Sequence, residues 1–544
     1  MKKLQIITLG LALVAFFACQ PQSNRTSTSE DRAALFDYII LKTIERESIS
    51  EPKTRVMNYD PLKDMLKFRD EMIAADTDQE LLHVLMKMSN VRRDRHAVVN
   101  TVEGGLKVNE DVNRSAPLVF QTDYAEPGNY FFFVGDYAVN MEQYAGGQVP
   151  EIGDKLLAVN GMSIEEYFEE LRLYLRYSSY NGLWRVMAEA LPKQHYRLPV
   201  PLDQTEVSFT LENKNGQVYD LTLPYLDLNE IQWEGYYKLH GDHRYSDFHK
   251  TLSTISYDIY EHSRLPVIII DWYGFRPSLI EDVDSLISYA QTNGMLGYDV
   301  IFDGTRARGG SNGAYLIRRL FSEPFHVTYG NLKISDLTPL FIEDRIQAFE
   351  SGELYASTTD GGKWQIEWLT TDVAEAYENG LNFSNNVPHK LAHLPKDSDG
   401  ILQPAPVRFT GTTVSLLGPF GGSHLDQYAS MVIDNKLGHT IGMPVGGFSS
   451  TWEFGEILHF PISGKPVAYF EWGMGHTLRP NVVDPVKVVD KYGRYYGDAM
   501  DPDGVVLEGN PPSVDKLILQ TRDNYLNYYD ILLEEALRYL GHRP

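Results

Sequence analysis

Cysteine is almost absent from this sequence of 544 residues, which contains only Cys19. With a single cysteine the chain cannot form an internal disulfide, so an oxidising compartment would place no redox demand on it. Basic residues are also scarce, with 49 Lys and Arg against 74 Asp and Glu and a formal net charge of −25. Binding to DNA or RNA depends on neutralising phosphates, so such an acidic chain has no electrostatic reason to bind either. We expect no nucleic-acid partner and no cofactor.

The apolar run near the start of the sequence is short. It extends from Ile6 to Phe17, follows two lysines, and ends one residue before the only cysteine. A run of this length is too short to cross a bilayer comfortably and is typical of a signal-peptide core. The pattern resembles a bacterial lipobox, although Phe16 is bulkier than the usual residue at its position. It implies a lipoprotein signal peptide over 1–18, acylation of Cys19 as a membrane anchor and a polar tether over 19–29. An ordinary cleaved signal or a buried cysteine is the alternative.

The pattern of apolar and polar residues changes along the chain. Its length allows roughly three domains of about 150 residues. Amphipathic stretches predict an N-terminal helical region over 30–115. Short strands and turns follow over 116–228. From about residue 264 strands alternate with helices, which predicts an α/β domain with a parallel sheet, and we assign residues 229–544 to it. Residues from about 327 to 410 are less regular and are interpreted as an insertion or cap.

One segment of the strand-rich region carries a recognisable pattern. Residues Gly153 to Gly161 read GDKLLAVNG and closely resemble the signature GD-x-[IL]-[LI]-x-[VI]-N-G of PDZ domains. A PDZ domain binds an extended peptide by adding it as a strand to a sheet. An alternating stretch, TEVSFTLENKNGQVYDLTL, follows with the Asn215-Gly216 pair typical of a hairpin turn. A PDZ-like domain over 116–228 is predicted, and another small β-rich domain with an Asn-Gly turn is the alternative.

The stretch TTVSLLGPFGGSHLDQYASMVIDNKLGHTIG places Ser423 between a predicted strand, Val414 to Gly418, and a helical pattern that begins at Leu425. A serine at a helix start, with Asp426 three residues later, is close to a capping box. A nucleophilic serine requires the same position, because a sharp turn exposes its hydroxyl and free helix amides can bind an oxyanion. The local sequence leaves both interpretations open.

The order of the motifs is similar to that of the S41 serine peptidases, the tail-specific and tricorn-like proteases. The PDZ-like segment is followed by VIFDGTRARGGSNG, by the Ser423 stretch and by GVVLEGNPPSVDKL. The resemblance covers residues from roughly 80 to 540. It implies an α/β fold with a ClpP/crotonase-like core, a PDZ-like domain and an N-terminal helical region, and it implies a serine-type peptidase that acts on polypeptides.

The resemblance also implies how Ser423 would be assisted at the reacting carbonyl. Ser423 corresponds to the family's nucleophile at the start of a helix. The strand ending at Asp303, with Gly309 and Gly310 in the turn after it, corresponds to the segment that supplies oxyanion-hole amides, and the amide of His424 would complete that hole. An ordinary βα turn is the alternative for the two glycines.

A serine nucleophile requires a base. The family's Ser-Lys branch has a lysine about two dozen residues after the serine, but GMPVGGFSSTWEF contains none there. The tricorn-like branch uses a histidine in a D-x-H segment, which corresponds to His96 in NVRRDRHAVV. The resemblance therefore implies that His96 is the general base and that Glu508, in LEGNPPSVD, orients it or stabilises its charge. A loop or core histidine and a surface carboxylate are the alternatives.

Several positions depart from the family pattern. Arg95 stands where some tricorn-like members have a serine before the histidine, and the turn TRARGG lacks the usual asparagine. Asn510 and Pro511 replace the expected glycine and valine after Glu508. These departures weaken the assignment of Glu508 more than that of Ser423.

Two groups of residues could suggest a metal site but match no trusted ligand spacing. They are His240, Asp242, His243 and His249, and Asp498, Asp501 and Asp503. We therefore predict no metal. The resulting hypothesis is a lipid-anchored serine endopeptidase of the bacterial cell envelope that cleaves exported or periplasmic polypeptides. The alternative is an inactive S41-like lipoprotein that binds peptides or glycans, favoured by an aromatic content of 12%.

Overall fold

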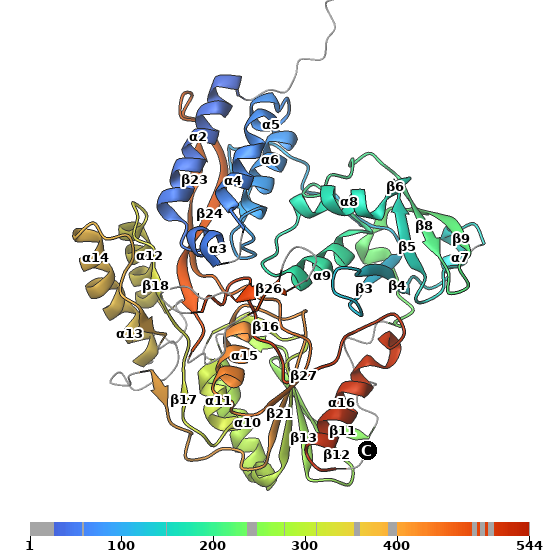
Figure 1. The fold of residues 1–544 in the computed structure, drawn as a ribbon, viewed down its shortest axis with the longest axis vertical. Helices are drawn as coiled ribbons and strands as arrows, with labels where there is room; N and C mark the ends of the chain where they lie inside the picture. The colour runs from blue at the N-terminus through green and yellow to red at the C-terminus, as the bar shows by residue number, and fades with distance from the viewer. Residues whose placement is uncertain are drawn as a thin grey trace, which may run out of the picture.

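A seven-stranded sheet organises the carboxyl-terminal half of this computed structural model (Figure 1). The structure describes residues 27–542 apart from 57–58, 148, 237–246, 277, 312, 353–359, 390–399, 481–486, 490–494 and 499–504. The strands lie in the order β11 (Phe248–Ser253), β12 (Tyr257–His262), β13 (Val267–Trp272), β15 (Asp299–Asp303), β21 (Thr413–Leu417), β22 (His439–Gly442) and β27 (Lys516–Leu517). The five strands from β13 to β27 are parallel, and β11 and β12 are antiparallel additions at one edge.

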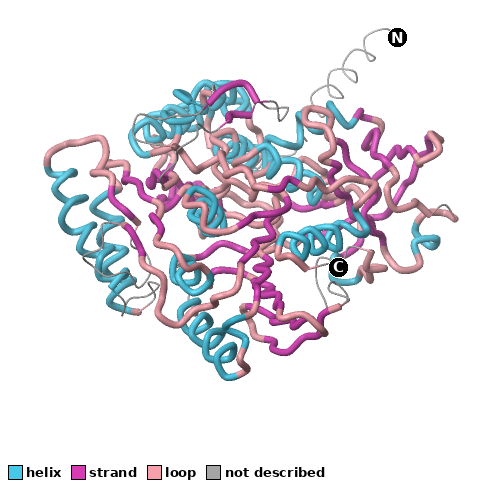
Figure 2. Tube along the Cα trace, turned by 60° about the horizontal axis from the view of Figure 1, so that its bottom comes forward, coloured by secondary structure: helices cyan, strands magenta, loops and turns pink. Residues whose placement is uncertain are grey.

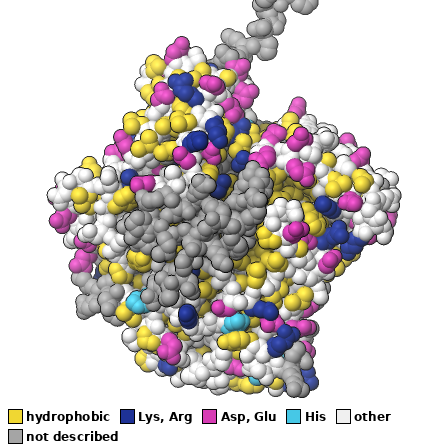
Figure 3. Space-filling view, viewed as in Figure 1, with side chains coloured by type: hydrophobic (Ala, Val, Ile, Leu, Met, Phe, Trp, Pro, Cys, Tyr) yellow, Lys and Arg dark blue, Asp and Glu magenta, His cyan; other side chains and the backbone are white. Residues whose placement is uncertain are grey.

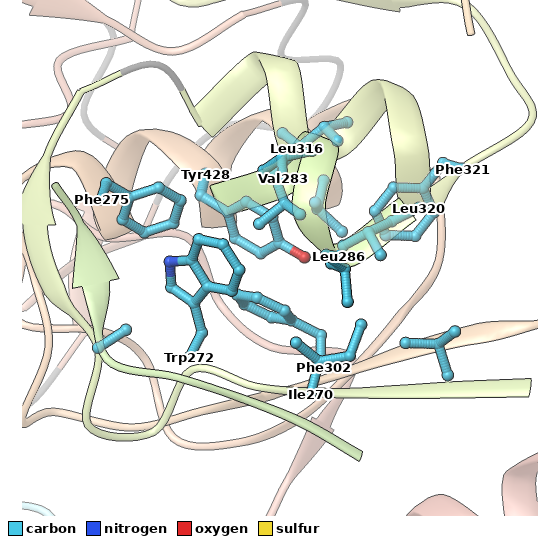
Figure 4. Close-up of a cluster of buried hydrophobic side chains, with 14 of the residues drawn as sticks. Ile270, Trp272, Phe275, Val283, Leu286, Phe302, Leu316, Leu320, Phe321 and Tyr428 are labelled. Carbon is cyan, nitrogen blue, oxygen red and sulfur yellow. The ribbon is translucent and has the colours of Figure 1, made fainter. Parts of the chain in front are cut away.

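Both faces of this sheet are covered by helices, as the continuous apolar runs of its strands require. On one face pack α10 (Leu279–Thr292), α11 (Gly313–Leu320) and α15 (His424–Asp434), whose side chains meet Ile270, Trp272 and Phe302 from the sheet (Figure 4). On the other face Val267 and Ile269 pack against α16 (Tyr528–Tyr539). Alternate residues of β13 thus point to opposite faces, and the predicted α/β unit with a parallel sheet is confirmed.

A second, antiparallel sheet corresponds to the strand-rich part of the sequence. Its strands lie in the order β3 (Leu118–Asp123), β4 (Phe131–Tyr137), β5 (Lys155–Val159), β8 (Glu206–Glu212) and β9 (Val218–Pro224), and β6 (Met162–Ser163) pairs with β5. Helices α8 (Ile164–Leu171) and α9 (Tyr180–Ala190) pack on it. The predicted hairpin is the β8–β9 pair, and Gly216 in its turn has φ +79°, which favours glycine.

The first described helices are α2 (Ser29–Arg46), α3 (Ser50–Val56), α4 (Pro61–Met65), α5 (Arg69–Ala74) and α6 (Asp78–Asn90). They share one core with a long hairpin from near the other end of the chain, β23 (Thr451–His459) and β24 (Pro466–Leu478). In Figure 1 this hairpin rises beside α2, and in Figure 2 strands run through the middle of the molecule with helices around them. The helical region is therefore tied to the carboxyl-terminal part of the chain. None of the helices that the structure describes is long and apolar enough to cross a membrane.

The segment expected to be less regular is helical over 338–351 and 360–378. It forms α12 (Thr338–Ser351), α13 (Asp360–Trp368), a π-helical turn (Leu369–Val373) and α14 (Ala374–Glu378). The buried residues of α12 are Thr338 and Phe341. A helix with so few buried side chains lacks the regular spacing of apolar residues by which a helix is predicted from sequence. These helices join the core of the N-terminal helices and the β23–β24 hairpin.

Candidate active site

Ser423 lies at the sharp turn between β21 and α15. Its backbone has φ +61° and ψ −121°, a conformation that costs a residue with a side chain about 1–3 kcal/mol. Its side chain makes no capping hydrogen bond, and only its carbonyl joins the helix, accepting from the Asp426 amide at 2.9 Å. Of the two interpretations left open by the sequence, helix capping by the hydroxyl is not what the structure shows. The hydroxyl is available to another partner.

That partner is His96, from the segment after α6. Its Nε2 lies 3.0 Å from Ser423 Oγ, although 327 positions separate the two residues in the sequence. The His96 amide donates to Asp94 Oδ1 at 3.0 Å, and the imidazole edge meets the Phe448 ring at 5.5 Å between centroids. A serine hydroxyl in contact with a positioned imidazole is the arrangement that nucleophilic catalysis requires.

The other ring nitrogen of His96 faces a hydroxyl that the sequence analysis did not single out. His96 Nδ1 lies 3.3 Å from Ser450 Oγ, and Ser450 Oγ donates to Asp94 Oδ1 at 2.6 Å. Burial alone would raise the pKa of Asp94, but the charges of Lys53 and His96 outweigh burial and lower it. Asp94 is therefore an ionised acceptor at neutral pH, and Ser450 connects it to the imidazole.

A second carboxyl group lies near the same nitrogen. Glu453 Oε1 is 3.6 Å from His96 Nδ1. Burial, followed by the charge of Asp94, raises the pKa of Glu453 to about 8, so it is mostly protonated at pH 7. A neutral carboxyl group stabilises a developing imidazolium less than a carboxylate does. Asp94, reached through Ser450, is the charged group in this part of the site.

Glu508, the carboxylate expected to orient the histidine, lies one step further away. Its Oε2 accepts hydrogen bonds from the backbone amides of Ser449 and Ser450, the latter at 2.7 Å. Among the described residues no hydrogen bond joins Glu508 to His96. Burial raises the pKa of Glu508 to about 7, against the opposing charge of Lys53. Glu508 thus holds the backbone that carries Ser450 and affects the histidine through that hydroxyl.

A buried lysine balances these carboxylates. Lys53 Nζ donates to the carbonyls of Arg93 at 2.6 Å and Arg92 at 3.0 Å and lies 3.8 Å from Glu508 Oε1. Its side chain is 1% exposed, and burial lowers its pKa despite the nearby carboxylates. No local pattern indicates this role, because Lys53 lies in the short helix α3, more than 350 positions from Glu508 and Ser423. A site assembled from such distant segments has no local signature.

The glycine turn expected to form the oxyanion hole lies against Ser423. A Cβ at Gly309 would collide with the side chain of Ser423, and a Cβ at Gly310, whose φ is +142°, would collide with the carbonyl of Phe275. Gly309 and Gly310 belong to β16 (Arg308–Gly310), which pairs with β14 (Gly274–Phe275). Only glycine allows this strand to approach Ser423 so closely.

His424, the first residue of α15, contributes more than its amide. Its Nε2 accepts a hydrogen bond from the Gly313 amide at 2.6 Å, at the start of α11. Burial lowers the pKa of His424 to about 3, so the ring is neutral and acts as an acceptor. The starts of α11 and α15 are thereby fixed to each other beside the Ser423 turn.

Some residues singled out in the sequence are placed elsewhere or not described. Cys19 and residues 240–243 lie outside the described part of the chain, as do Asp501 and Asp503. His249 lies in β11 with a largely exposed side chain, 3.8 Å from Glu261. Within the described residues no group of three or more His, Cys, Asp or Glu side chains could hold a metal ion.

Comparison with known proteins identifies the fold. A scan of protein-family models found no match, and a search of curated proteins found none either. Among solved structures the chain is similar to mature CPAF, with 12% identity, a TM-score of 0.64 and coverage of 94% of this chain and 98% of that one. It is equally similar to mature CPAF complexed with lactacystin, with 13% identity, a TM-score of 0.63 and coverage of 94% and 99%. The chain has the fold of an S41-type peptidase.

The S41-type fold agrees with the fold class predicted from the order of the motifs, which is confirmed. A weaker likeness, with a TM-score of 0.37 and 10% identity, joins the chain to the photosystem II D1 C-terminal processing protease over 91% of this chain and 94% of that one. The S41-type fold explains why residues from both ends of the sequence meet at Ser423, since it brings the segment after α6 against the helix that begins at His424.

Proposed function

We propose that the chain is a serine endopeptidase that cleaves polypeptides through an acyl-enzyme on Ser423. The observation that carries the proposal is the 3.0 Å contact between Ser423 Oγ and His96 Nε2, made by a hydroxyl that takes no part in helix capping. The S41-type fold supports the same function. An inactive binding protein would have no need to hold Ser423 in a strained backbone conformation against an imidazole.

In the proposed reaction His96 Nε2 accepts the Ser423 proton as the oxygen attacks the substrate carbonyl carbon. The imidazolium that forms is stabilised through Ser450 by the Asp94 carboxylate. The negative charge on the carbonyl oxygen is bound by backbone amides, for which the His424 amide and the turn at Gly309 are the expected donors. His96 then donates the proton to the leaving amine. Water next attacks the acyl carbon while His96 accepts its proton, and His96 returns that proton to Ser423 Oγ as the bond to the acid product breaks.

The proposal is tested by labelling purified residues 20–544 with a fluorophosphonate probe and mapping the modified peptide. We expect one label, on Ser423, that is lost in Ser423→Ala and in His96→Ala. His459→Ala is the matched control, because His459 is an exposed histidine at the far end of the β23 strand. Absence of label on the wild-type protein, with and without added peptide, would refute the peptidase and favour the inactive peptide- or glycan-binding alternative.

The membrane anchor is a separate part of the proposal. The short apolar run before Cys19 supports cleavage after residue 18 and acylation of the thiol and amine of Cys19, which would hold the enzyme at the bacterial cell envelope. Exported or periplasmic polypeptides would then be its substrates. The test is the mass of the mature N-terminal peptide and membrane fractionation of Cys19→Ser. An unacylated wild-type peptide would refute the anchor and leave the peptidase proposal intact.

A further inference from the structure

A cavity of about 210 Å³ lies beside the candidate active site, between the N-terminal helical region and the β-rich domain. It is lined from one side by α6 and the segment after it and from the other by α9, β7 (Lys193–His195) and the residues next to them. Its volume is about seven times the ~30 Å³ that a water molecule occupies in the liquid, which is room for a side chain.

The cavity is lined by four cations and one carboxylate. The cations are Arg95, Arg176, Lys193 and Arg197, and the carboxylate is Glu189. Glu189 is engaged by Arg185 at 2.7 Å, whereas within the described part of the chain none of the four lining cations forms an ion pair. In Figure 3 dark-blue side chains gather near where the helical region meets the rest of the molecule. A positive cavity is unexpected in a chain with a formal net charge of −25.

Two of the cations have donors to spare. Among the described residues Arg176 makes one long hydrogen bond, from Nη1 to the Arg95 carbonyl at 3.3 Å, and the Arg95 guanidinium stacks on the Phe448 ring at 4.7 Å. Burial and the charge of Arg185 lower the pKa of Arg95 to about 10. Arg197, by contrast, is held by the Val99 carbonyl and Asn100. These neutral acceptors occupy donors of Arg197 without cancelling its charge, so all four cations keep their charge, and the donors that can still be used belong to Arg95, Arg176 and Lys193.

The cavity is close to the reacting groups. Arg95 precedes His96 directly in the chain, and both side chains contact the Phe448 ring. On the other side, α9 contacts the turn before Ser423, where Arg185 Nη1 donates to the Phe420 carbonyl at 2.8 Å. A polypeptide that presents a carbonyl carbon to Ser423 would therefore pass beside the cavity.

We propose that this cavity binds a carboxylate of the polypeptide substrate and so selects where the chain is cleaved. Guanidinium groups bind carboxylates through two parallel hydrogen bonds. Arg95 and Arg176 both line the cavity, and among the described residues their guanidinium groups make only the single hydrogen bond from Arg176. An isolated positive cavity in an acidic protein also concentrates anionic segments that the rest of the surface repels. The proposal rests on the proposed peptidase function. The carboxylate can belong to an acidic side chain or to the C-terminus of the substrate.

Binding is measured separately from cleavage, on the Ser423→Ala form. The probes are fluorescent decapeptides that carry Glu or Gln at one position, each with a free or an amidated C-terminus, and Kd is measured by anisotropy. We expect about tenfold tighter binding for the peptide with the preferred carboxylate, which corresponds to about 1.4 kcal/mol. A Glu-to-Gln difference identifies a side chain, and a difference between free and amidated peptides identifies the C-terminus.

The double variant Arg176→Gln, Lys193→Gln in the same background should remove this difference without weakening the binding of neutral peptides. Arg172→Gln is the matched control, because Arg172 lies outside the cavity lining and pairs with Glu169 at 2.7 Å. Equal binding of all peptides, or a preference that survives the double variant, would overturn the proposal. Cleavage of the neutral peptide by wild-type enzyme tests the peptidase itself, so the two failures are distinguishable.

Discussion

Replacement of Ser450 by alanine tests whether the hydroxyl between His96 and Asp94 positions the base. The substitution removes the 3.3 Å contact to His96 Nδ1 and the 2.6 Å hydrogen bond to Asp94 Oδ1. A hydrogen bond to a charged group contributes about 1.5–3 kcal/mol, and each 1.36 kcal/mol of barrier changes a rate tenfold. We therefore expect kcat to fall by about 10- to 150-fold. KM should stay unchanged, because Ser450 lies on the side of the imidazole away from Ser423.

The adjacent residue supplies a matched control. Ser449 is equally buried, its backbone amide also donates to Glu508, and its hydroxyl has no hydrogen-bond partner among the described residues. Ser449→Ala should therefore leave kcat and KM within about twofold of the wild type. The assay is initial-rate cleavage of a fluorogenic peptide, with circular dichroism to verify folding. Equal effects of the two substitutions, or a Ser450→Ala loss confined to KM, would refute the positioning role.

Three further predictions concern other parts of the molecule. Gly309→Ala should abolish fluorophosphonate labelling of Ser423 while the far-ultraviolet circular dichroism stays native, because the new methyl group collides with the nucleophile; retained labelling would show that the β16 strand can move away. Lys53→Met should lower the free energy of unfolding by about 3–5 kcal/mol in a denaturant titration, since it leaves the buried Glu508 and Asp94 without the cation that faces them, and a smaller loss would mean that these carboxylates protonate at little cost. Burial lowers the pKa of His389 to about 3, whereas a histidine in the unfolded chain has a pKa of about 6.5. Between these two values the unfolded chain binds one more proton than the folded chain, so the free energy of unfolding falls as the pH falls, by about 2 kcal/mol at pH 5. His389→Gln should reduce this slope in denaturation midpoints measured from pH 7 to 5, and an unchanged slope would contradict the assignment.

The sequence allowed the parts of the site with local signals to be predicted. The turn before Ser423, the glycine pair in β16 and the D-x-H segment are short patterns, and the resemblance of their order to the S41 serine peptidases is what implied their roles. The local sequence alone left Ser423 open between helix cap and nucleophile. The parallel sheet was predictable from local signals, since its strands are continuous apolar runs such as Val267–Trp272.

What could not be predicted depends on contacts between distant segments. Ser450 is one of many serines, and only the packing of β24 beside β1 (Val99–Asn100) brings its loop to His96. From the sequence alone Lys53 would be taken for a surface lysine, because its burial depends on the packing of α3 against the loop at Arg92 and Arg93. No periodicity or spacing in the sequence indicates contacts between such distant segments.

The long β23–β24 hairpin has a consequence for when the protein becomes active. His96 lies near the start of the chain, Ser423 lies beyond its middle, and the strand pairing that fixes them together, Val99 opposite Phe470, spans more than 350 residues. Contacts of such sequence separation form late, because the loop between them must close first. In a chain that is still being synthesised, Ser423 and His96 are therefore apart. We therefore expect Ser423 to react with a fluorophosphonate only once folding is complete.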